Sequence, residues 1–373
     1  MNVLLCATGL NKGGAEKMLC ALCTRTAVYG HAFTPVVASF IGGHYADVLR
    51  EAGVETYILI PSASPLRVLW SLIRYLRFLI SNRKRIDLVH AFLADGGFLA
   101  LASKLIIRKP LIYSVRNSTQ RTDLKRFSVR YWMRSLFHAA AIRNAALVTC
   151  NSYYIKQLLA AEMHCDATVI MNAVEKPDKA RYTDEAIRAR YFIDRAAFYV
   201  VSVCNMRYPQ KDIVTLLQVA KKLSAIRFVL VGDGESTGFF KKTAAALSLP
   251  NVVFAGYQKN VYPFLAYSQC YVLLAKHEGF PNTVLEAMVS EIPVVMSGIP
   301  EVKGVLVNNE NSLLVKNGDV EAIAQAIVSL QSDPVIRQRL VRAAYAMVCD
   351  RFSYENMIHE NYATYTRVLN DNA

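Results

Sequence analysis

The segment from Cys270 to Pro293 reads CYVLLAKHEGFPNTVLEAMVSEIP, and it predicts a strand, a tight loop and a helix. The apolar run Tyr271–Ala275 has the length and composition of a short buried strand. A Gly-Phe-Pro-Asn sequence then interrupts the run, and Asn282 is a favourable N-cap for a helix over Thr283–Ser290. A helix that begins directly after a strand presents backbone N–H groups that bind phosphate and other anions.

Two carboxylates flank this predicted phosphate-binding loop. Glu278 stands at the carboxyl end of the strand, and Glu286 follows eight residues later, one turn into the helix. Because a carboxylate repels phosphate, we expect both side chains to face neutral hydrogen-bond donors such as sugar hydroxyls. A nucleotide sugar offers hydroxyls on its ribose and on its transferable sugar, with a diphosphate between them. The segment therefore indicates a nucleotide-sugar site, and two surface acids on an ordinary strand–loop–helix are the alternative.

Strands and helices alternate along the whole chain, which predicts an α/β fold. The first series of apolar strand segments ends at Met171, and a second series begins at Phe198 after a polar stretch. Such alternation is typical of doubly wound parallel sheets, in which ligands bind at the carboxyl ends of the strands. The length of 373 residues is sufficient for two such domains.

Composition narrows the class of protein further. The chain is 53% hydrophobic and 19% charged, which excludes a disordered protein. It has no uninterrupted apolar run of about 18 residues, so we expect no transmembrane helix. The first residues, MNVLLCATGLNKGG, lack a basic leader and predict a strand rather than a signal peptide. Eight scattered cysteines favour buried thiols in a reducing cytoplasm over disulfides, zinc sites or redox sites.

The net charge of +14 is distributed unevenly along the chain. Residues 1–175 contain 21 Lys and Arg against 10 Asp and Glu, a difference of +11, and residues 176–373 contain 22 against 19, a difference of +3. The first half therefore predicts an anionic partner that the second half does not share. Nucleic acid would match this charge, but no nucleic-acid recognition motif supports it, and we expect none to bind.

Two basic helical stretches in the first half predict contact with a membrane. On a helical wheel over Arg67–Ser81, the apolar residues form one face that the sheet would bury: Leu69, Leu72, Ile73, Leu76, Leu79 and Ile80. The opposite face combines cations with aromatic rings, namely Arg67, Trp70, Arg74, Arg77 and Phe78. A stretch within residues 121–144 repeats the combination with Lys125, Arg126, Arg130, Tyr131, Trp132 and Arg134. Arginines beside exposed rings are typical of helices on anionic lipid, and a solvated face with buried rings is the alternative.

The string EGFPNTVLEAM at residues 278–288 resembles the E-x7-E signature of retaining GT-B glycosyltransferases of family 4. The resemblance extends over nearly the whole chain and is strongest from Phe198 to Ile327. It implies a GT-B fold, in which two Rossmann-like doubly wound domains face each other across a cleft. It further implies an acceptor-binding, membrane-facing domain over residues 1–172 and a nucleotide-sugar-binding domain over residues 173–351. The last segment, residues 352–373, would be a helix that crosses back to the N-terminal domain.

Two cations and several loop residues are expected to bind the donor. Arg207 and Lys211 follow the strand Phe198–Val203, where Arg can grip two phosphate oxygens and Lys supplies a point charge. The resemblance implies that both hold the donor diphosphate, that Glu286 binds the ribose, and that backbone near Gly256 holds the base. The expected donor-binding residues are Gly14, Arg207, Lys211, Gly256, Tyr257, Gly279, Phe280, Pro281, Asn282, Thr283, Val284 and Glu286.

Three residues are candidates for catalysis. The resemblance implies that Glu278 holds the sugar hydroxyls and stabilises positive charge at the anomeric carbon. Many family members carry a histidine after the strand that matches Leu111–Val115, where this chain has Arg116. An arginine cannot be a general base, but it could stabilise the departing phosphate or hold an acceptor phosphate. His90, in the preceding strand, is the alternative imidazole, although a histidine there is also common as a packed residue.

The combined prediction is a retaining glycosyltransferase that moves a sugar from a nucleoside-diphosphate donor, expected to be a UDP-sugar, to a glycan. The sequence contains no Asp-x-Asp pair, so we expect activity without a metal or cofactor, with Arg, Lys and a helix N-terminus holding the diphosphate. The expected acceptor is a polyprenyl-diphosphate-linked or other glycan in surface polysaccharide synthesis, at the cytoplasmic face of the membrane. A nucleotide-sugar epimerase of the same fold and a non-catalytic sugar-nucleotide-binding protein are the alternatives.

Overall fold

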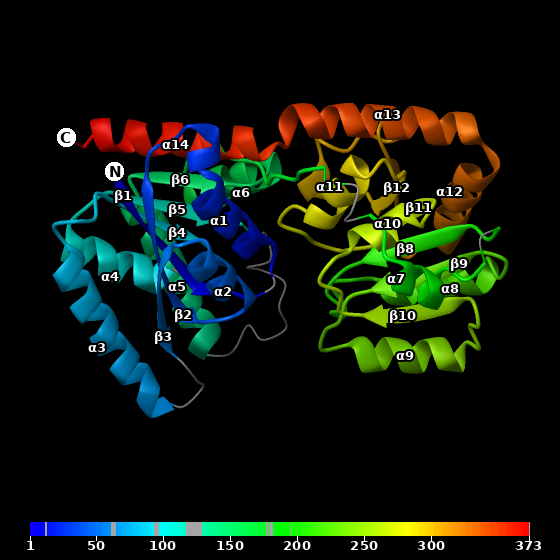
Figure 1. Cartoon of the computed structure of the whole chain (residues 1–373), viewed down its shortest axis with the longest axis horizontal. Helices are drawn as coiled ribbons and strands as arrows, with labels where there is room; N and C mark the ends of the chain where they lie inside the picture. Colours follow the sequence, from blue (N-terminus) through cyan, green and yellow to red (C-terminus); the bar gives the residue numbers. More distant parts are fainter. Residues whose placement is uncertain are drawn as a thin grey trace. The chain divides into compact units, whose positions relative to one another are not determined.

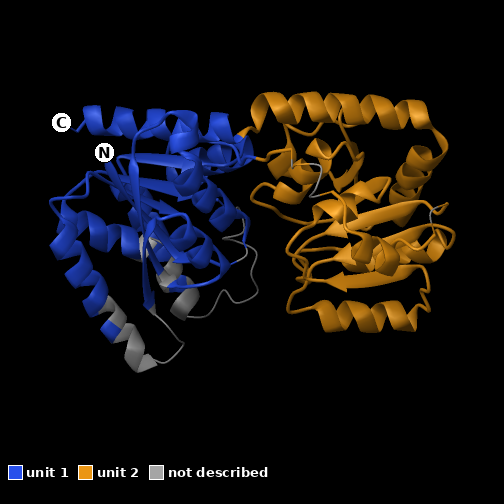
Figure 2. Cartoon of the chain, in the orientation of Figure 1, with its two compact units in different colours: residues 1–173, 354–373 blue, residues 174–353 orange. Residues whose placement is uncertain are grey.

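The computed structural model describes residues 1–11, 13–60, 65–92, 97–116, 129–176, 178, 182–194 and 196–372. The chain divides into two compact units (Figure 2): unit 1 is residues 1–173 with 354–373, and unit 2 is residues 174–353. Each is an α/β unit built on its own parallel sheet. The cleft that the sequence predicts between two domains stays a prediction. No helix in these described ranges is long and apolar enough to span a membrane.

Unit 1 contains a seven-stranded parallel sheet in the order β3-β2-β1-β4-β5-β6-β7. Its strands are β1 (Asn2–Gly9), β2 (Thr34–Ile41), β3 (Glu55–Ile60), β4 (Leu88–Phe92), β5 (Leu111–Val115), β6 (Leu147–Cys150) and β7 (Ala167–Val169). The order of the strands reverses between β1 and β4, which creates the kind of switch point where doubly wound sheets bind ligands. His90 lies on β4, and Arg116 directly follows β5.

Helices cover both faces of this sheet (Figure 1). They are α1 (Gly14–Arg25), η1 (Ala27–Tyr29), α2 (His44–Glu51), α3 (Pro65–Asn82), α4 (Gly97–Ile107), α5 (Val129–Asn144), α6 (Tyr153–Met163) and α14 (Tyr354–Asn370). The alternation of side chains along β1 produces the two layers. Val3 and Leu5 join a buried cluster with α1 and α14, whereas Leu4 and Cys6 join a second cluster with α3, α4 and α5.

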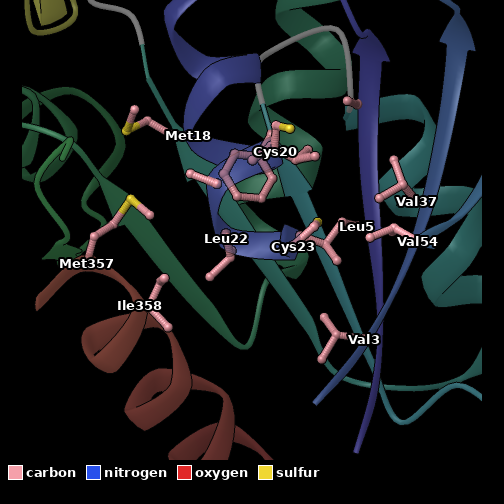
Figure 3. Close-up of a cluster of buried hydrophobic side chains, with 14 of the residues drawn as sticks. Val3, Leu5, Met18, Cys20, Leu22, Cys23, Val37, Val54, Met357 and Ile358 are labelled. Carbon is pink, nitrogen blue, oxygen red and sulfur yellow. The ribbon is translucent and has the colours of Figure 1, made fainter. Parts of the chain in front are cut away.

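All of unit 2 separates α14 from the rest of unit 1 in the sequence, yet α14 completes the core of unit 1. Met357 and Ile358 pack into the buried cluster formed by β1 and α1, as Figure 3 shows. Tyr365 is fully buried in the same cluster. The guanidinium carbon of Arg25 lies 4.3 Å from the ring centre of Tyr354, which adds a cation–π contact.

Unit 2 contains a six-stranded parallel sheet in the order β10-β9-β8-β11-β12-β13. The strands are β8 (Tyr199–Val203), β9 (Arg227–Val231), β10 (Val252–Gly256), β11 (Cys270–Leu273), β12 (Val294–Ser297) and β13 (Leu313–Val315). The helices are α7 (Glu185–Tyr191), α8 (Ile213–Lys222), α9 (Thr237–Ala246), α10 (Tyr262–Ala266), α11 (Asn282–Val289), η5 (Pro300–Val302), α12 (Val320–Ser332) and α13 (Pro334–Arg351). Strands β8, β11 and β12 are wholly buried, as expected when helices cover both faces of a parallel sheet. The strand order reverses between β8 and β11.

Helix α3 differs from the helical wheel in two respects. Phe78 is 8% exposed and packs beside Tyr75, so the predicted position of this ring on the arginine face is wrong. Leu76 and Ile80, predicted on the buried face, are 41% and 56% exposed. The physical reason for this difference is a buried hydrogen bond between α3 and α4. The hydroxyl of Tyr75 lies 2.6 Å from the hydroxyl of Ser103 on α4. The buried face of α3 therefore includes Tyr75, which the helical wheel had not counted as apolar.

Each basic stretch contains one exposed tryptophan. Trp70 on α3 is 64% exposed, and Trp132 on α5 is 66% exposed. Arg74 and Arg77 are exposed beside the former. Helix α5 begins at Val129, so Lys125 and Arg126 lie outside the described residues, as do the side chains of Arg67, Arg130, Tyr131 and Arg134.

Candidate active site

The carboxyl ends of β8 and β11 carry two loops that are hydrogen-bonded to each other. The Asp212 N–H donates to the carbonyl oxygen of Leu274, and the Lys276 N–H donates to that of Gln210, both at 2.9 Å. Backbone bonds of this kind are insensitive to side-chain identity, so the sequence does not reveal them. They hold the loop after β8, which carries the predicted phosphate-binding cations, beside the loop after β11, which carries the first glutamate of the signature.

Lys211 and Glu278 form an ion pair where these two loops meet. Their side chains are only 9% and 13% exposed. Burial of the amine lowers the pKa of Lys211, and the nearby Cys204 acts in the opposite direction to a smaller extent. The structure thus brings a cation predicted to hold the donor diphosphate into contact with the acid predicted to hold the sugar. Adjacent positions suit these roles, because the anomeric carbon of a nucleotide sugar is bonded directly to the diphosphate.

Helix α11 begins four residues after Glu278, and its first turn departs from the prediction. The N-cap is Pro281, so the prediction that Asn282 caps the helix is wrong, and Asn282 is its first residue. The helix starts early because the carbonyl oxygen of Pro281 already accepts a hydrogen bond from the Val284 N–H at 3.1 Å. This bond engages the amide of Val284, which with Thr283 is among the residues predicted to bind the donor. The amide of Thr283 remains the other predicted contact.

The remaining residues of the signature lie in different environments. Gly279 is half-buried in the loop, whereas Phe280 is 5% exposed and stacks on Phe352 with ring centroids 5.5 Å apart. Phe280 therefore has a packing role in unit 2. Glu286 is 6% exposed on α11. The pKa of Tyr271 is raised, by burial above all and to a smaller extent by the nearby charge of Glu286, so this second carboxylate lies close to β11.

Arg207 lies in the same loop as Lys211 but outside the buried pair. Its side chain is 53% exposed, and its Nε donates to Oε1 of Glu235 at 3.0 Å. An exposed ion pair contributes roughly 0–1 kcal/mol, so a diphosphate can replace Glu235 at little cost. The Lys211 N–H donates to the carbonyl oxygen of Arg207 at 2.8 Å, so a single turn of backbone carries both predicted cations.

Gly232, the first glycine after β9, has a packing role. Gly232 has φ +125°, and a Cβ there would lie 1.9 Å from the carbonyl oxygen of Cys204 in the loop after β8. Only a glycine therefore allows the two loops to approach so closely. Gly256, with φ +68°, accepts a hydrogen bond from the Gly232 N–H at 2.8 Å, and Tyr257 beside it is 46% exposed. A role of Gly256 and Tyr257 in holding the base stays a prediction.

A polar cluster that the sequence analysis missed supports the loop after β11. The hydroxyl of Ser297, at the end of β12, accepts a hydrogen bond from the Ala275 N–H at 3.1 Å and donates to Oδ1 of Asn317 at 2.5 Å. The amide nitrogen of Asn317 donates to the carbonyl oxygen of Ala275 at 2.7 Å. These bonds fix Ala275 on both sides, three residues before Glu278. The indication in the sequence was Ser297 at the end of an otherwise apolar strand. Many strands end in a serine, so this feature alone does not identify a site.

In unit 1, His90 is fully buried in a hydrogen-bond network. Its Nδ1 lies 2.7 Å from the hydroxyl of Tyr365, and its Nε2 lies 2.8 Å from the hydroxyl of Ser114. Ser114 in turn lies 2.6 Å from the hydroxyl of Thr149. Burial, with a smaller effect of the charge on Arg116, holds the pKa of His90 well below its usual value. Because both ring nitrogens have partners inside the unit, this arrangement favours the packed-residue interpretation over direct catalysis.

Arg116 is a buried cation at the carboxyl end of β5. Its Nη1 donates to Oδ1 of Asn172 at 3.0 Å, and its guanidinium carbon lies 5.2 Å from the ring centre of Phe92. Within the described residues it forms no ion pair with a carboxylate, and its Nε has no hydrogen-bond partner. Burial lowers the pKa of Arg116 to about 10, so the side chain remains a cation at neutral pH. A buried, incompletely bonded guanidinium is costly and suits an anionic ligand.

Gly14 is the exposed first residue of α1, after the N-cap Gly13, which provides no side-chain cap. Its predicted contact with the donor therefore stays a prediction. Among the residues that the structure describes, no group of three or more His, Cys, Asp or Glu side chains is arranged to hold a metal ion. Independence from metal also stays a prediction.

Two family models match the chain. The model described as Glycosyl transferases group 1 matches residues 183–347, and the model described as Glycosyltransferase Family 4 matches residues 12–176. The first match includes the loops after β8 and β11 and the whole of α11. The chain belongs to the group 1 glycosyltransferases. For this family member the predicted GT-B class is confirmed, because its two-unit α/β fold is that of GT-B glycosyltransferases of known structure.

Individual relatives of this group 1 family member come from bacterial polysaccharide synthesis. The lipopolysaccharide core biosynthesis glycosyltransferase LpsE of Rhizobium meliloti is 32% identical over 147 residues, which are 39% of this chain and 43% of the relative. The UDP-Gal:alpha-D-GlcNAc-diphosphoundecaprenol alpha-1,3-galactosyltransferase of Escherichia coli is 23% identical, over 71% of this chain and 73% of the relative. The chain spans about half the length of the first Rhizobium relatives that it matches. The structure of Anabaena HepE with UDP-glucose has a TM-score of 0.82 at 19% identity, over 98% of this chain and 100% of that one, which shows the fold.

Proposed function

We propose that this protein is a retaining glycosyltransferase that moves a sugar from a UDP-sugar to a hydroxyl group of a glycan acceptor. The observation that supports this most strongly is the buried Lys211–Glu278 pair beside the start of α11, in a chain of the group 1 family. A cation for the diphosphate and an acid for the sugar are in contact there. The UDP-glucose bound to Anabaena HepE, which shares the fold, supports a UDP-sugar as the first donor to test.

In the proposed reaction, the bond between the anomeric carbon and the diphosphate oxygen breaks, and the acceptor oxygen bonds to the same face of that carbon. The electron pair of the broken bond stays on UDP, where Lys211, Arg207 and the amide of Thr283 stabilise the charge. The proton of the acceptor hydroxyl moves to the departing phosphate oxygen. Glu278 stabilises positive charge as it develops on the sugar, and Glu286 binds the ribose. Donor binding thereby replaces the Lys211–Glu278 contact with contacts of each residue to the substrate.

We further propose that the acceptor is a lipid-linked glycan in the assembly of a surface polysaccharide. The names of the relatives support this, since one acts on a sugar attached to diphosphoundecaprenol and another belongs to lipopolysaccharide core biosynthesis. In unit 1, the guanidinium of Arg116 suits an anionic group on such an acceptor. A phosphate would supply the partner that its Nε lacks among the described residues.

The reaction is tested with the full chain, a panel of radiolabelled UDP-sugars and a synthetic GlcNAc-diphospholipid acceptor. We expect transfer with retention of the anomeric configuration, measured by NMR of the product, and unchanged activity in EDTA. An inverted product would contradict the retaining mechanism, and activity that disappears in EDTA and returns with Mg²⁺ would contradict metal independence. Conversion of the donor to its epimer without acceptor would support the epimerase alternative.

Substitution of Arg116 separates acceptor binding from donor binding. We expect Arg116→Gln to slow transfer by about 10- to 200-fold, since a charge-assisted hydrogen bond contributes roughly 1.5–3 kcal/mol. Hydrolysis of the donor in the absence of acceptor should not change. Arg116→Lys is the matched control, because it keeps the charge and should recover part of the transfer rate. If hydrolysis falls as far as transfer, Arg116 acts on the donor instead.

We also propose that the protein lies on the cytoplasmic face of the membrane as a peripheral protein with an anionic lipid surface as its partner. The charge of +11 over residues 1–175 and the exposed rings of Trp70 and Trp132 support this proposal. Each cation close to an anionic membrane contributes about 1 kcal/mol, and salt weakens the attraction. The protein should therefore float with anionic vesicles in low salt and dissociate in high salt, and failure to float with them would contradict it.

A further inference from the structure

Unit 1 contains a cavity of about 860 Å³ at the amino end of β5. It lies between the end of α4, the loop that leads to β5, helix α5 and the end of α14. Ligand pockets commonly measure about 300–1,000 Å³, so the volume is sufficient for a lipid headgroup. Arg116 lies at the opposite end of β5, six residues after Pro110 of the cavity, which is about 20 Å at roughly 3.3 Å per residue of strand. The cavity is therefore distinct from the edge of the sheet where the acceptor is proposed to bind.

Three cations border this cavity, and the described residues that line it include no Asp or Glu. They are Lys104, Arg108 and Lys109, which come from the last turn of α4 and the residues after it. Arg108 adopts φ +57°, and its N–H donates to the carbonyl oxygen of Lys104 at 2.9 Å, which turns the chain at the helix end. The amine of Lys104 in turn donates to the carbonyl oxygen of Asn144 on α5. The turn at the end of α4 thus places all three cations along the border of the cavity.

Apolar side chains lie beside these cations and remain exposed. Leu105, which lines the cavity between two of the cations, is 76% exposed. Phe137 of α5 lines the cavity as well, and the same helix exposes Leu136 to 51% and Trp132 to 66%. Trp132 and Leu136 are four residues apart and so share one face of α5. A soluble anion would use the cations but would leave these apolar groups in water, whereas a lipid uses both.

We propose that this cavity binds the phosphate headgroup of an anionic membrane phospholipid, with Leu105 against the apolar part of the lipid. Charge complementarity supports this occupant, because basic pockets at membrane surfaces hold anionic headgroups. The exposed side chain of Leu105 adds an apolar contribution that salt does not screen. The inference builds on the proposed membrane partner but locates the contact at α4 and α5 rather than on the arginine face of α3.

The test is flotation of the full chain with vesicles of phosphatidylcholine containing 30% phosphatidylglycerol or none. The triple variant Lys104→Gln, Arg108→Gln, Lys109→Gln should bind the anionic vesicles about 100-fold more weakly, at about 1 kcal/mol per cation and 1.4 kcal/mol per factor of ten. The matched control replaces three exposed lysines of unit 2 with Gln: Lys221, Lys242 and Lys259. It removes the same charge and should bind almost as well as the wild-type chain. An equal loss in both triple variants would overturn the proposal, because the attraction would then be general.

Leu105→Ser provides a second variant that does not depend on charge. Its side chain is mostly exposed, so folding should be unaffected, which the melting temperature checks. We expect Leu105→Ser to float less than the wild-type chain, and we expect this difference to persist in high salt. A change from dimer to monomer in Leu105→Ser by light scattering would overturn the proposal and show an interface between copies. Displacement of the protein from vesicles by millimolar glycerol phosphate alone would likewise point to a soluble anion. Donor hydrolysis should be normal in every variant, so this inference can fail while the proposed transferase activity stands.

Discussion

Removing one partner of the Lys211–Glu278 pair should destabilise unit 2 more than removing both. Lys211→Met leaves the carboxylate of Glu278 at 13% exposure without its cation. Breaking a buried ion pair in this way costs about 3–5 kcal/mol, whereas replacing both members with apolar residues is often neutral or stabilising. Unit 2 has 180 residues (174 to 353), and in units of that size 1 kcal/mol shifts the melting temperature by about 2–4 °C. The single variant should therefore melt about 6–20 °C lower, and Lys211→Met with Glu278→Leu should recover most of the loss.

The exposed pair in the neighbouring loop is the matched control. Arg207 and Glu235 form an ion pair at 3.0 Å, but their side chains are 53% and 64% exposed. Arg207→Met should change stability by less than about 1 kcal/mol, because solvent screens the charges. Differential scanning calorimetry of the full chain measures the transitions of all variants. Both Lys211 variants should lose transfer activity, including the stable double variant, because Lys211 and Glu278 are also proposed to bind the substrate.

Two results would refute this reasoning. If Lys211→Met melts no lower than Arg207→Met, the Lys211–Glu278 pair is more accessible to solvent than the exposed fractions of its side chains indicate. If the double variant melts as low as the single variant, the two side chains are not coupled and the loss comes from packing alone. If the double variant retains transfer activity, the Lys211–Glu278 pair is not needed for the reaction.

Three further predictions concern residues of both units. Glu286→Ala should chiefly raise the KM for the donor, whereas Glu278→Gln should chiefly lower kcat, and steady-state kinetics that show the same constant affected in both would remove this division. Gly232→Ala should destabilise unit 2 by more than about 1 kcal/mol in thermal unfolding, because its Cβ would meet a carbonyl oxygen, while Gly238→Ala, in open space on α9, should be neutral or stabilising. Unit 1 should lose stability as the pH falls below about 6.5, because His90 is neutral when folded and binds a proton when unfolded, and His90→Gln should flatten this dependence in melting curves at pH 5–7.

The features of unit 2 that are local in sequence were the most predictable. The strand, loop and helix around Glu278 follow one another within 20 residues (270 to 289), so apolar runs and turn residues were enough to locate them. The start of α11 was missed by one residue, because proline can cap a helix through its carbonyl oxygen without a polar side chain. The ion pair with Lys211 was not predicted. It depends on the adjacency of β8 and β11, which are separated in the sequence by two strand–helix units.

The features of unit 1 depend on contacts that are remote in sequence. One of the two hydroxyl partners of His90 is Tyr365, 275 residues away, so a sequence pattern could not distinguish a buried histidine from a catalytic one. Burial of Phe78 was missed for a related reason, since the hydroxyl bond between Tyr75 and Ser103 joins two helices. By contrast, the exposure of Trp70 followed from the arginines around it.

The position of α14 has a consequence for the order of events during synthesis. On the ribosome, the first 173 residues emerge with their sheet but without the helix that supplies Met357, Ile358 and Tyr365 to the core. At about 5–20 residues per second, the 180 residues of unit 2 delay that helix by roughly 10–40 s, which is long compared with the folding of a domain. The nascent first unit therefore spends this interval with an apolar groove open, while the second unit completes all of its contacts first. A chaperone that shields the groove during translation would act on residues 1–173 until residues 354–373 arrive.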